Sequence, residues 1–339
     1  MAVENLAPRP LVDASAVIDD LMAATGDGMD AVNRLILSRS ESSVDMVPEV
    51  ANHLIDAGGK RLRPMLTLAA SALFSRVRGN EIRFAAAVEF MHNATLLHDD
   101  VVDESDMRRG RPAARTIWGN QASVLVGDFL LGQAFLMMVE SRDIDALGVL
   151  SRAAAVIAEG EVFQLAKAGD LSTTPQDYEK IIHAKTATLF EAATEVGAMA
   201  GGADSTSRKA LAAYGRELGM AFQLVDDVLD YGGAQGSLGK NTGDDLREGK
   251  MTLPVILALQ AGSEAERKTI ERALGNPESG EAELAEILAI FARYDTLTQT
   301  MAKAERHAET ARAALANIPQ TVERDILFGV PEFCTSRAY

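Results

Sequence analysis

The chain has 339 residues, of which 47% are hydrophobic, so it can bury a large core within one or two domains. Its formal net charge of −16 argues against a nucleic-acid partner, because proteins that bind phosphate backbones carry clustered Lys and Arg. Cys334 is the single cysteine. Neither a disulfide framework nor a cysteine-based zinc site can therefore form within the chain, and we expect a reducing, cytoplasmic setting.

The N-terminus reads MAVENLAPRP and has no basic segment that leads into an apolar one. Nowhere do about 18 apolar residues follow one another without interruption. We therefore expect neither a targeting segment nor an integral membrane helix.

Apolar residues recur at helical spacing, and no run of alternating β-branched and polar residues is bounded by hairpin dipeptides. No Pro/Ser-rich linker divides the chain, so we predict one all-α domain over residues 1–339. The predicted helices cover residues 12–25, 29–56, 61–77, 81–107, 114–140, 144–169, 175–201, 205–231, 250–262, 264–274, 280–292 and 295–317. Thr174 before Pro175 is typical of an N-cap followed by Pro at the first helical position.

Two similar acidic pentapeptides end two of these helices. They are Asp99-Asp100-Val101-Val102-Asp103 and Asp226-Asp227-Val228-Leu229-Asp230. Residues four apart share one face of a helix, so Asp99 and Asp103 project together, as do Asp226 and Asp230. One such motif alone is typical of a solvated helix face.

Each acidic motif follows a mainly apolar stretch, which places it where a helix leaves the core. Carboxylates in such places must be paired or bind metal. A site built only of oxygen ligands suits Mg²⁺, whose remaining ligands are water and substrate phosphate. The sequence therefore predicts a phosphate ester or diphosphate substrate.

Basic residues lie beside both acidic motifs, where phosphate oxygens would need charge-assisted donors. Lys60 and Arg63 follow the Gly58-Gly59 pair, and Arg108 and Arg109 follow the first motif. Lys240 and Lys250 lie in or beside the Gly-rich segment 232–249 after the second motif. Any one of these residues taken alone reads as a solvent-facing charge, but their placement favours phosphate binding.

The segments GGKRLRP, HNATLLHDDVVDESDMRRGRP, HAKTATLF and FQLVDDVLDYGGAQGSLGKNTGDDLREGKMTLP occur in this order within about residues 50–260. Together they resemble the trans-isoprenyl diphosphate synthase family. The chain is most similar to the long-chain, all-trans members that make the octaprenyl or decaprenyl tail of ubiquinone. This resemblance implies a bundle of long antiparallel helices around a central cavity, usually in a homodimer.

The resemblance also implies roles for particular residues. Asp99, Asp103 and Asp226 would bind about three Mg²⁺ ions, with Asp100 and Asp230 as supporting acids, and together with Lys185 they would be the catalytic residues. The diphosphate of isopentenyl diphosphate would bind to Lys60, Arg63, His92 and Arg109. The allylic diphosphate, such as farnesyl diphosphate, would bind to Arg108, Lys185, Thr186, Gln223, Lys240 and Lys250. His98 and His183 are expected to be structural.

Product length should depend on the helix behind the first acidic motif, along which the growing hydrocarbon must run. Ala94 and Thr95, five and four residues before Asp99, are small, whereas short-chain members of the family commonly carry Phe or Tyr there. We therefore predict an open path and a long-chain product. Candidates for a deeper floor are Met91, Val88, Phe135, Met137 and Met138, all of which also read as plain core residues.

Four alternatives remain. A shorter-chain geranylgeranyl diphosphate synthase would share the motifs. A terpene cyclase is disfavoured by Lys60, Arg63 and the second acidic motif. A di-iron protein could use Glu89 and His92 as Glu-x-x-His, but such bundles need two of these motifs and we find no second. A non-catalytic subunit of a heteromer is disfavoured because both acidic motifs are intact.

Overall fold

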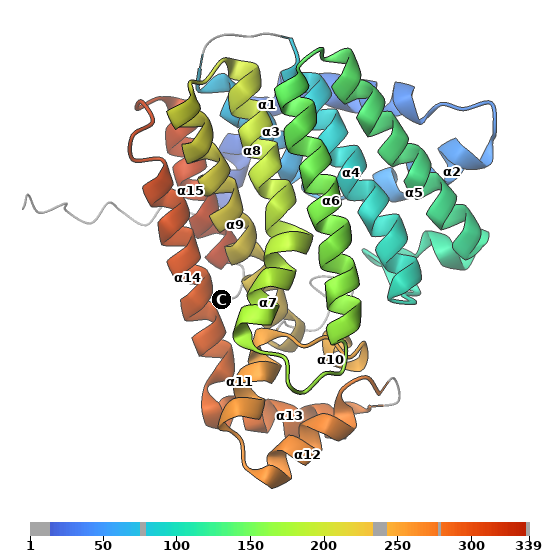
Figure 1. Cartoon of the computed structure of the whole chain (residues 1–339), viewed down its shortest axis with the longest axis vertical. Helices are drawn as coiled ribbons and strands as arrows, with labels where there is room; N and C mark the ends of the chain where they lie inside the picture. The colour runs from blue at the N-terminus through green and yellow to red at the C-terminus, as the bar shows by residue number, and fades with distance from the viewer. Residues whose placement is uncertain (1–13, 75–78, 233–242, 277–278, 337–339) are drawn as a thin grey trace, which may run out of the picture.

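The computed structural model describes residues 14–74, 79–232, 243–276 and 279–336, and these residues form an all-α protein as predicted. Long helices run side by side along the long axis of the molecule, and several short helices gather at one end (Figure 1). Lys240, one of the predicted ligands, lies outside the described residues.

The first half of the chain contributes α1 (Ala14–Ser40), α2 (Met46–Asp56), α3 (Leu62–Ala72), α4 (Glu81–Val102), α5 (Ala114–Glu140) and α6 (Ile144–Lys167). Strands β1 (Met107–Arg108) and β2 (Arg111–Pro112) form a small antiparallel hairpin between α4 and α5. The middle of the chain contains α7 (Pro175–Ile182), the π-helix η1 (His183–Ala187), α8 (Thr188–Gly201) and α9 (Ser205–Gly232). The remainder forms α10 (Asp244–Arg247), α11 (Leu253–Ala261), α12 (Glu264–Ala273), α13 (Glu281–Tyr294), α14 (Thr296–Ala314) and α15 (Val322–Ser336).

The predicted break between helices 12–25 and 29–56 is wrong. Helix α1 continues through Gly26 and Gly28, and the chain breaks only after Ser40. A Cβ at Gly28 would lie 2.9 Å from Leu68 Cδ1, so this glycine serves close packing between α1 and α3 and does not end a helix.

The end of α4 also differs from the prediction. Helix α4 ends at Val102, five residues early, and Glu104 has a φ of 51°, which is incompatible with a continuing helix. Arg115 Nε donates to the Ser105 carbonyl at 2.8 Å and holds the turn. Helix α15 was not predicted. It contains Pro331, and its buried face includes Leu327, Val330 and Phe333.

Glycines bring α9 very close to the segment that carries Lys185. A Cβ at Gly215 would lie 2.4 Å from the Phe190 carbonyl oxygen, and a Cβ at Gly219 would lie 2.5 Å from Ala187 Cα. Only glycine permits these contacts. The second acidic motif on α9 is therefore held against η1 and α8.

Helix α5 is, among the described residues, the one helix long and apolar enough to cross a membrane by length and composition alone. Within the molecule, 44% of its most apolar stretch is buried. Core helices of proteins that do not enter membranes pass the same test, so this finding carries little weight by itself.

Candidate active site

Two lysines lie beside the first acidic motif. Lys185 Nζ lies 3.5 Å from Asp99 Oδ2, and Lys250 Nζ lies 2.9 Å from Asp103 Oδ2. Burial raises the pKa of Asp99, against the effect of Lys185. Burial acts in the same direction on Asp103, but Lys250 and Lys185 outweigh it and lower the pKa of that carboxyl. Asp99, in the last turn of α4, and Asp103, the residue that caps this helix, thus both face cations from distant parts of the chain.

The π-helix η1 connects the two acidic motifs. Its Lys185 contacts Asp99 on α4, whereas the hydroxyl of the next residue, Thr186, donates to Gln223 Oε1 on α9 at 2.7 Å. A π-helix carries an extra residue per turn and is frequently found at functional sites. Here it directs two consecutive side chains toward two different motifs.

A buried network lies behind the second motif. Gln223 Nε2 donates to Asp227 Oδ1 at 2.8 Å, and the Tyr178 hydroxyl donates to Asp227 Oδ2 at 2.6 Å. Burial, together with Asp245, raises the pKa of Asp227 to about 8, while both hydrogen bonds act in the opposite direction. Asp227 therefore fixes the Gln223 side chain, which in turn accepts the hydrogen bond from the Thr186 hydroxyl.

The segment after the Gly-rich loop joins the second motif to the first. The backbone amide of Asp245 donates to Asp230 Oδ2 at 3.2 Å. Lys250 lies 4.0 Å from Asp245 and 2.6 Å from Glu248, in addition to its contact with Asp103. Burial would lower the pKa of Lys250, but the three carboxylates outweigh it and raise that pKa, so Lys250 is charged at neutral pH.

Asp100 has a different environment from its neighbours in the motif. Its side chain is 1% exposed, and Arg108 Nε donates to its Oδ1 at 2.8 Å. In this structure Asp100 therefore positions Arg108, which the sequence predicted as a ligand of the allylic diphosphate.

A second basic cluster lies next to α4 and contains the residues predicted for isopentenyl diphosphate. Arg63 Nη1 lies 3.3 Å from His92 Nε2. A Cβ at Gly59 would lie 2.6 Å from the Arg109 guanidinium, so Arg109 packs directly on the backbone beside Lys60. Lys60 Nζ lies 4.4 Å from the centre of the Phe333 ring, which places α15 beside the cluster.

The charges of this cluster favour anion binding. Burial lowers the pKa of Arg63 to about 10, against Glu89 and Asp226, and Arg63 remains charged at neutral pH. Burial and the arginines hold the pKa of His92 well below its usual range, so its imidazole is neutral. Because Arg63 can only donate, His92 Nε2 accepts and Nδ1 carries the proton. The buried Arg63 Nε has no hydrogen-bond partner among the described residues, as expected of a donor kept for a ligand.

The donors of the acidic site fit Mg²⁺ by their chemistry. They are carboxylates without sulfur, and the side chains of Asp99 and Asp103 are only 15% and 16% exposed, so each needs a cation beside it. No three His, Cys, Asp or Glu side chains in the described ranges are close enough together to form a ready-made metal site.

The predicted chain-length residues lie in the core behind Asp99. Ala94 and Met91 are both 2% exposed and belong to the same buried cluster as Val88, Met137 and Met138. Thr95 is half-buried, and its hydroxyl donates to the His92 carbonyl at 2.8 Å.

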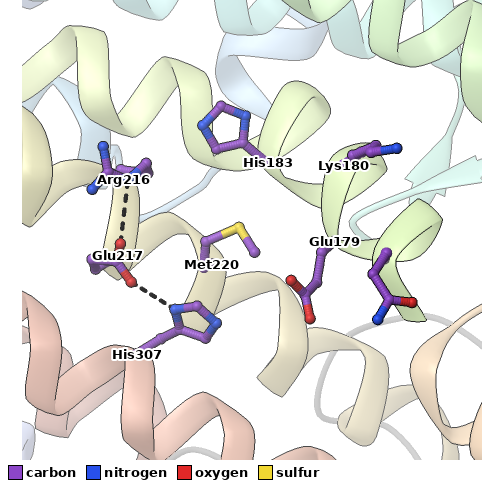
Figure 2. Close-up of a pocket in the computed structure, with 8 residues that line it drawn as sticks. Glu179, Lys180, His183, Arg216, Glu217, Met220 and His307 are labelled. Atoms are coloured by element: carbon purple, nitrogen blue, oxygen red, sulfur yellow. Dashed lines mark hydrogen bonds and ion pairs between the residues drawn. The ribbon is translucent and has the colours of Figure 1, made fainter.

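A separate depression of about 480 Å³ lies on the outer side of α7, η1, α9 and α14. Figure 2 shows Arg216 and Glu217 on one wall, with Glu217 also bonded to His307 at 2.7 Å. His183, on η1, also lines the depression. This depression contains none of the predicted catalytic or binding residues.

Comparison with known proteins decides the family. Residues 44–291 match the family described as Polyprenyl synthetase. The chain belongs to the polyprenyl synthetase family. Its members are prenyltransferases, and this chain is one of them.

Relatives in this polyprenyl synthetase family match nearly the whole chain. Octaprenyl diphosphate synthase of Escherichia coli (strain K12) is 41% identical over 322 residues, which cover 94% of this chain and 99% of that protein. Polyprenyl synthase from Caulobacter crescentus CB15 is 48% identical in sequence to this chain. Its crystal structure, complexed with calcium and isoprenyl diphosphate, has a TM-score of 0.92 over 98% of this chain and 100% of that one. A decaprenyl diphosphate synthase from Rhodobacter capsulatus is 47% identical, with a TM-score of 0.90 over 95% and 99% of the two chains.

Sequence reasoning missed several residues of this prenyltransferase site. Asp227 and Asp245 lie within the segments that resemble the family, but the resemblance assigns them no role. Their closeness in sequence to Asp226 and Lys250 was the available signal that they belong to the site. Glu161 and Tyr178 belong to no predicted motif. Their partners are 24 and 49 residues away in the chain, so local spacing could not reveal them.

Proposed function

We propose that this prenyltransferase is a long-chain all-trans polyprenyl diphosphate synthase, which makes an octaprenyl or decaprenyl product. It would condense isopentenyl diphosphate repeatedly, head to tail, onto an allylic diphosphate such as farnesyl diphosphate. The observation that carries the proposal is that α3, α4, η1, α9 and the segment around Lys250 place both acidic motifs and two basic clusters next to one another. The names of the relatives support the long-chain assignment.

Each cluster has a distinct task in this proposal. Lys185, Thr186 and Arg108 would bind the allylic diphosphate, while Arg63, Arg109, Lys60 and neutral His92 would hold the diphosphate of isopentenyl diphosphate. Mg²⁺ bound to Asp99, Asp103 and Asp226 would supply positive charge beside the departing diphosphate. The buried apolar residues of α4 and α5 would exclude water from the allylic carbon.

The same arrangement supports a placement of the two substrates in the site. Arg63 interacts electrostatically with Asp226, so the isopentenyl diphosphate cluster lies beside the second acidic motif, and Lys185 lies beside the first. The two diphosphates would thus be held side by side with their hydrocarbon parts toward the core. We further propose that the product serves the ubiquinone side chain and that the reaction occurs in the cytoplasm.

We also propose that the enzyme is a homodimer. Apolar side chains are exposed along neighbouring faces of α5 and α6, namely Ile117, Val124, Leu125, Leu136, Val139, Ile144, Val162 and Leu165. A depression of about 360 Å³, lined by Asn120, Gln121, Val124 and Leu125, lies on α5. An apolar face of this extent is typical of an interface with another copy.

Analytical ultracentrifugation tests the dimer. Leu125→Lys should produce monomers, whereas Val322→Lys, which changes an equally exposed apolar residue on α15, should not. A monomeric wild-type chain would refute the dimer.

The test of function is incubation of the purified chain with Mg²⁺, labelled isopentenyl diphosphate and farnesyl diphosphate, followed by chromatographic sizing of the products. We expect a product of eight to ten isoprene units. An endpoint at four units would assign a geranylgeranyl diphosphate synthase and overturn the long-chain proposal. No incorporation at all would favour a non-catalytic subunit.

A further inference from the structure

Glu161 on α6 lies in the candidate active site although no motif or role includes it. Its Oε2 accepts a hydrogen bond from Lys185 Nζ at 2.9 Å. The same ammonium group lies 3.5 Å from Asp99 Oδ2, so Lys185 is shared between a predicted metal ligand and a carboxylate outside the acidic motifs.

The backbone is shaped to permit this contact. Gly160 precedes Glu161, and a Cβ at Gly160 would lie 2.4 Å from Ala184 Cβ and 3.3 Å from the backbone nitrogen of Lys185. Any side chain at residue 160 would push η1 away from α6. Gly160 therefore allows Lys185 to approach Glu161.

The Lys185 ammonium group and a divalent cation compete for the Asp99 carboxylate. While Lys185 neutralises Asp99, that carboxylate is a poorer ligand for a divalent cation, because the two positive charges repel each other. A second carboxylate close to Lys185 gives the ammonium another partner when the cation binds. The side chains of Lys185, Asp99 and Glu161 are only 22%, 15% and 25% exposed, so these interactions are weakly screened by solvent.

We propose that Glu161 is a positioning residue that retains Lys185 when a divalent cation binds to Asp99, and so keeps the ammonium beside the diphosphate. The proposal rests on the proposed function for the cation and the diphosphate. Glu161 acts through Lys185 and is not itself a ligand of the ion.

The test is a double-mutant cycle that measures cation binding directly. The Mn²⁺ concentration for half-saturation is determined by electron paramagnetic resonance of the free ion, with inorganic diphosphate held at saturation for each variant. Glu161→Gln should raise this concentration at least about fivefold, the low end of typical coupling between sites. Glu159→Gln removes the same charge from an exposed residue of the same helix and should change it by less than about twofold.

The cycle is completed in a Lys185→Met background. There, Glu161→Gln should have no further effect, because the residue through which it acts is gone. An unchanged half-saturation in the single Glu161 variant would overturn the proposal. An effect of equal size in the Lys185→Met background would also overturn it, since Glu161 would then act on the cation itself.

Failure of the positioning role can be told apart from failure of the proposed function. If the wild-type chain elongates farnesyl diphosphate but the cycle shows no coupling, only the positioning role fails. If the cycle shows coupling but no condensation occurs, only the proposed function fails. Circular dichroism and thermal unfolding of all variants confirm that each one folds.

Discussion

Removal of the Tyr178 hydroxyl should weaken both the fold and allylic substrate binding. Tyr178 is 2% exposed, and its hydroxyl donates to Asp227 Oδ2 at 2.6 Å. Tyr178→Phe leaves that buried oxygen without the hydroxyl donor, which costs about 1–3 kcal/mol of the free energy of unfolding. Asp227 also anchors Gln223 and thereby Thr186, so the KM for farnesyl diphosphate should rise about fivefold, equivalent to about 1 kcal/mol of binding.

A matched control separates the two effects. The Tyr214 hydroxyl is equally buried and donates to the Leu327 carbonyl at 2.7 Å, on the side of the molecule where α9 meets α15. Tyr214→Phe also leaves a buried acceptor without a donor, because Pro331, four residues after Leu327, has no N–H. It should cost about 1–3 kcal/mol of stability, as much as Tyr178→Phe, and leave the KM unchanged. Urea unfolding and steady-state kinetics of both variants are the assays. If Tyr178→Phe leaves the KM unchanged, or if both variants raise it equally, the network has no part in placing Thr186.

Four further outcomes are expected. Asp99→Ala should reduce condensation to background while the helical circular dichroism spectrum is retained. Ala94→Phe should shorten the products, as judged by chromatographic sizing, because a large ring would fill space on α4 at the position where short-chain enzymes carry one. Gly215→Ala should destabilise the protein by at least about 1–3 kcal/mol in urea unfolding, since the added Cβ would lie 2.4 Å from a backbone carbonyl oxygen. Hydrogen bonds from His307 and Arg216 lower the pKa of Glu217, so Glu217→Gln should destabilise the protein at neutral pH and progressively less as the pH falls below about 4.5.

The sign of the last prediction follows from proton binding. A carboxyl group whose pKa is lower in the folded state contributes stability above its unfolded pKa and loses that contribution as the pH falls through the folded value. A constant difference between wild type and Glu217→Gln across this range would contradict it. For the other three, the contradictory results are a near-normal rate of Asp99→Ala at saturating Mg²⁺, an unchanged product ladder for Ala94→Phe, and wild-type stability of Gly215→Ala. Gly26→Ala, at a helical glycine with open space around it, should be neutral or slightly stabilising.

Much of the architecture followed from local rules. Helical periodicity predicted the all-α class. The four-residue spacing placed Asp103 one turn after Asp99, and in the structure the Asp103 amide donates to the Asp99 carbonyl although α4 ends at Val102. Glycine was a less reliable signal, because its local and tertiary uses cannot be told apart in a sequence. The predicted break between residues 25 and 29 does not exist, and Gly28 in that interval packs α1 against Leu68.

Local patterns in the sequence were enough to predict the helical class, the two acidic motifs and the types of charge that accompany them. The packing of the helices determines which polar groups meet: Lys185 with both Asp99 and Glu161, Lys250 with Asp103, and Tyr178 with Asp227. The difference lies in the distance along the chain over which each kind of interaction acts. Backbone geometry and side-chain periodicity act over about one helical turn, whereas the partner of a buried charge depends on how α4, α6, η1 and α9 pack together.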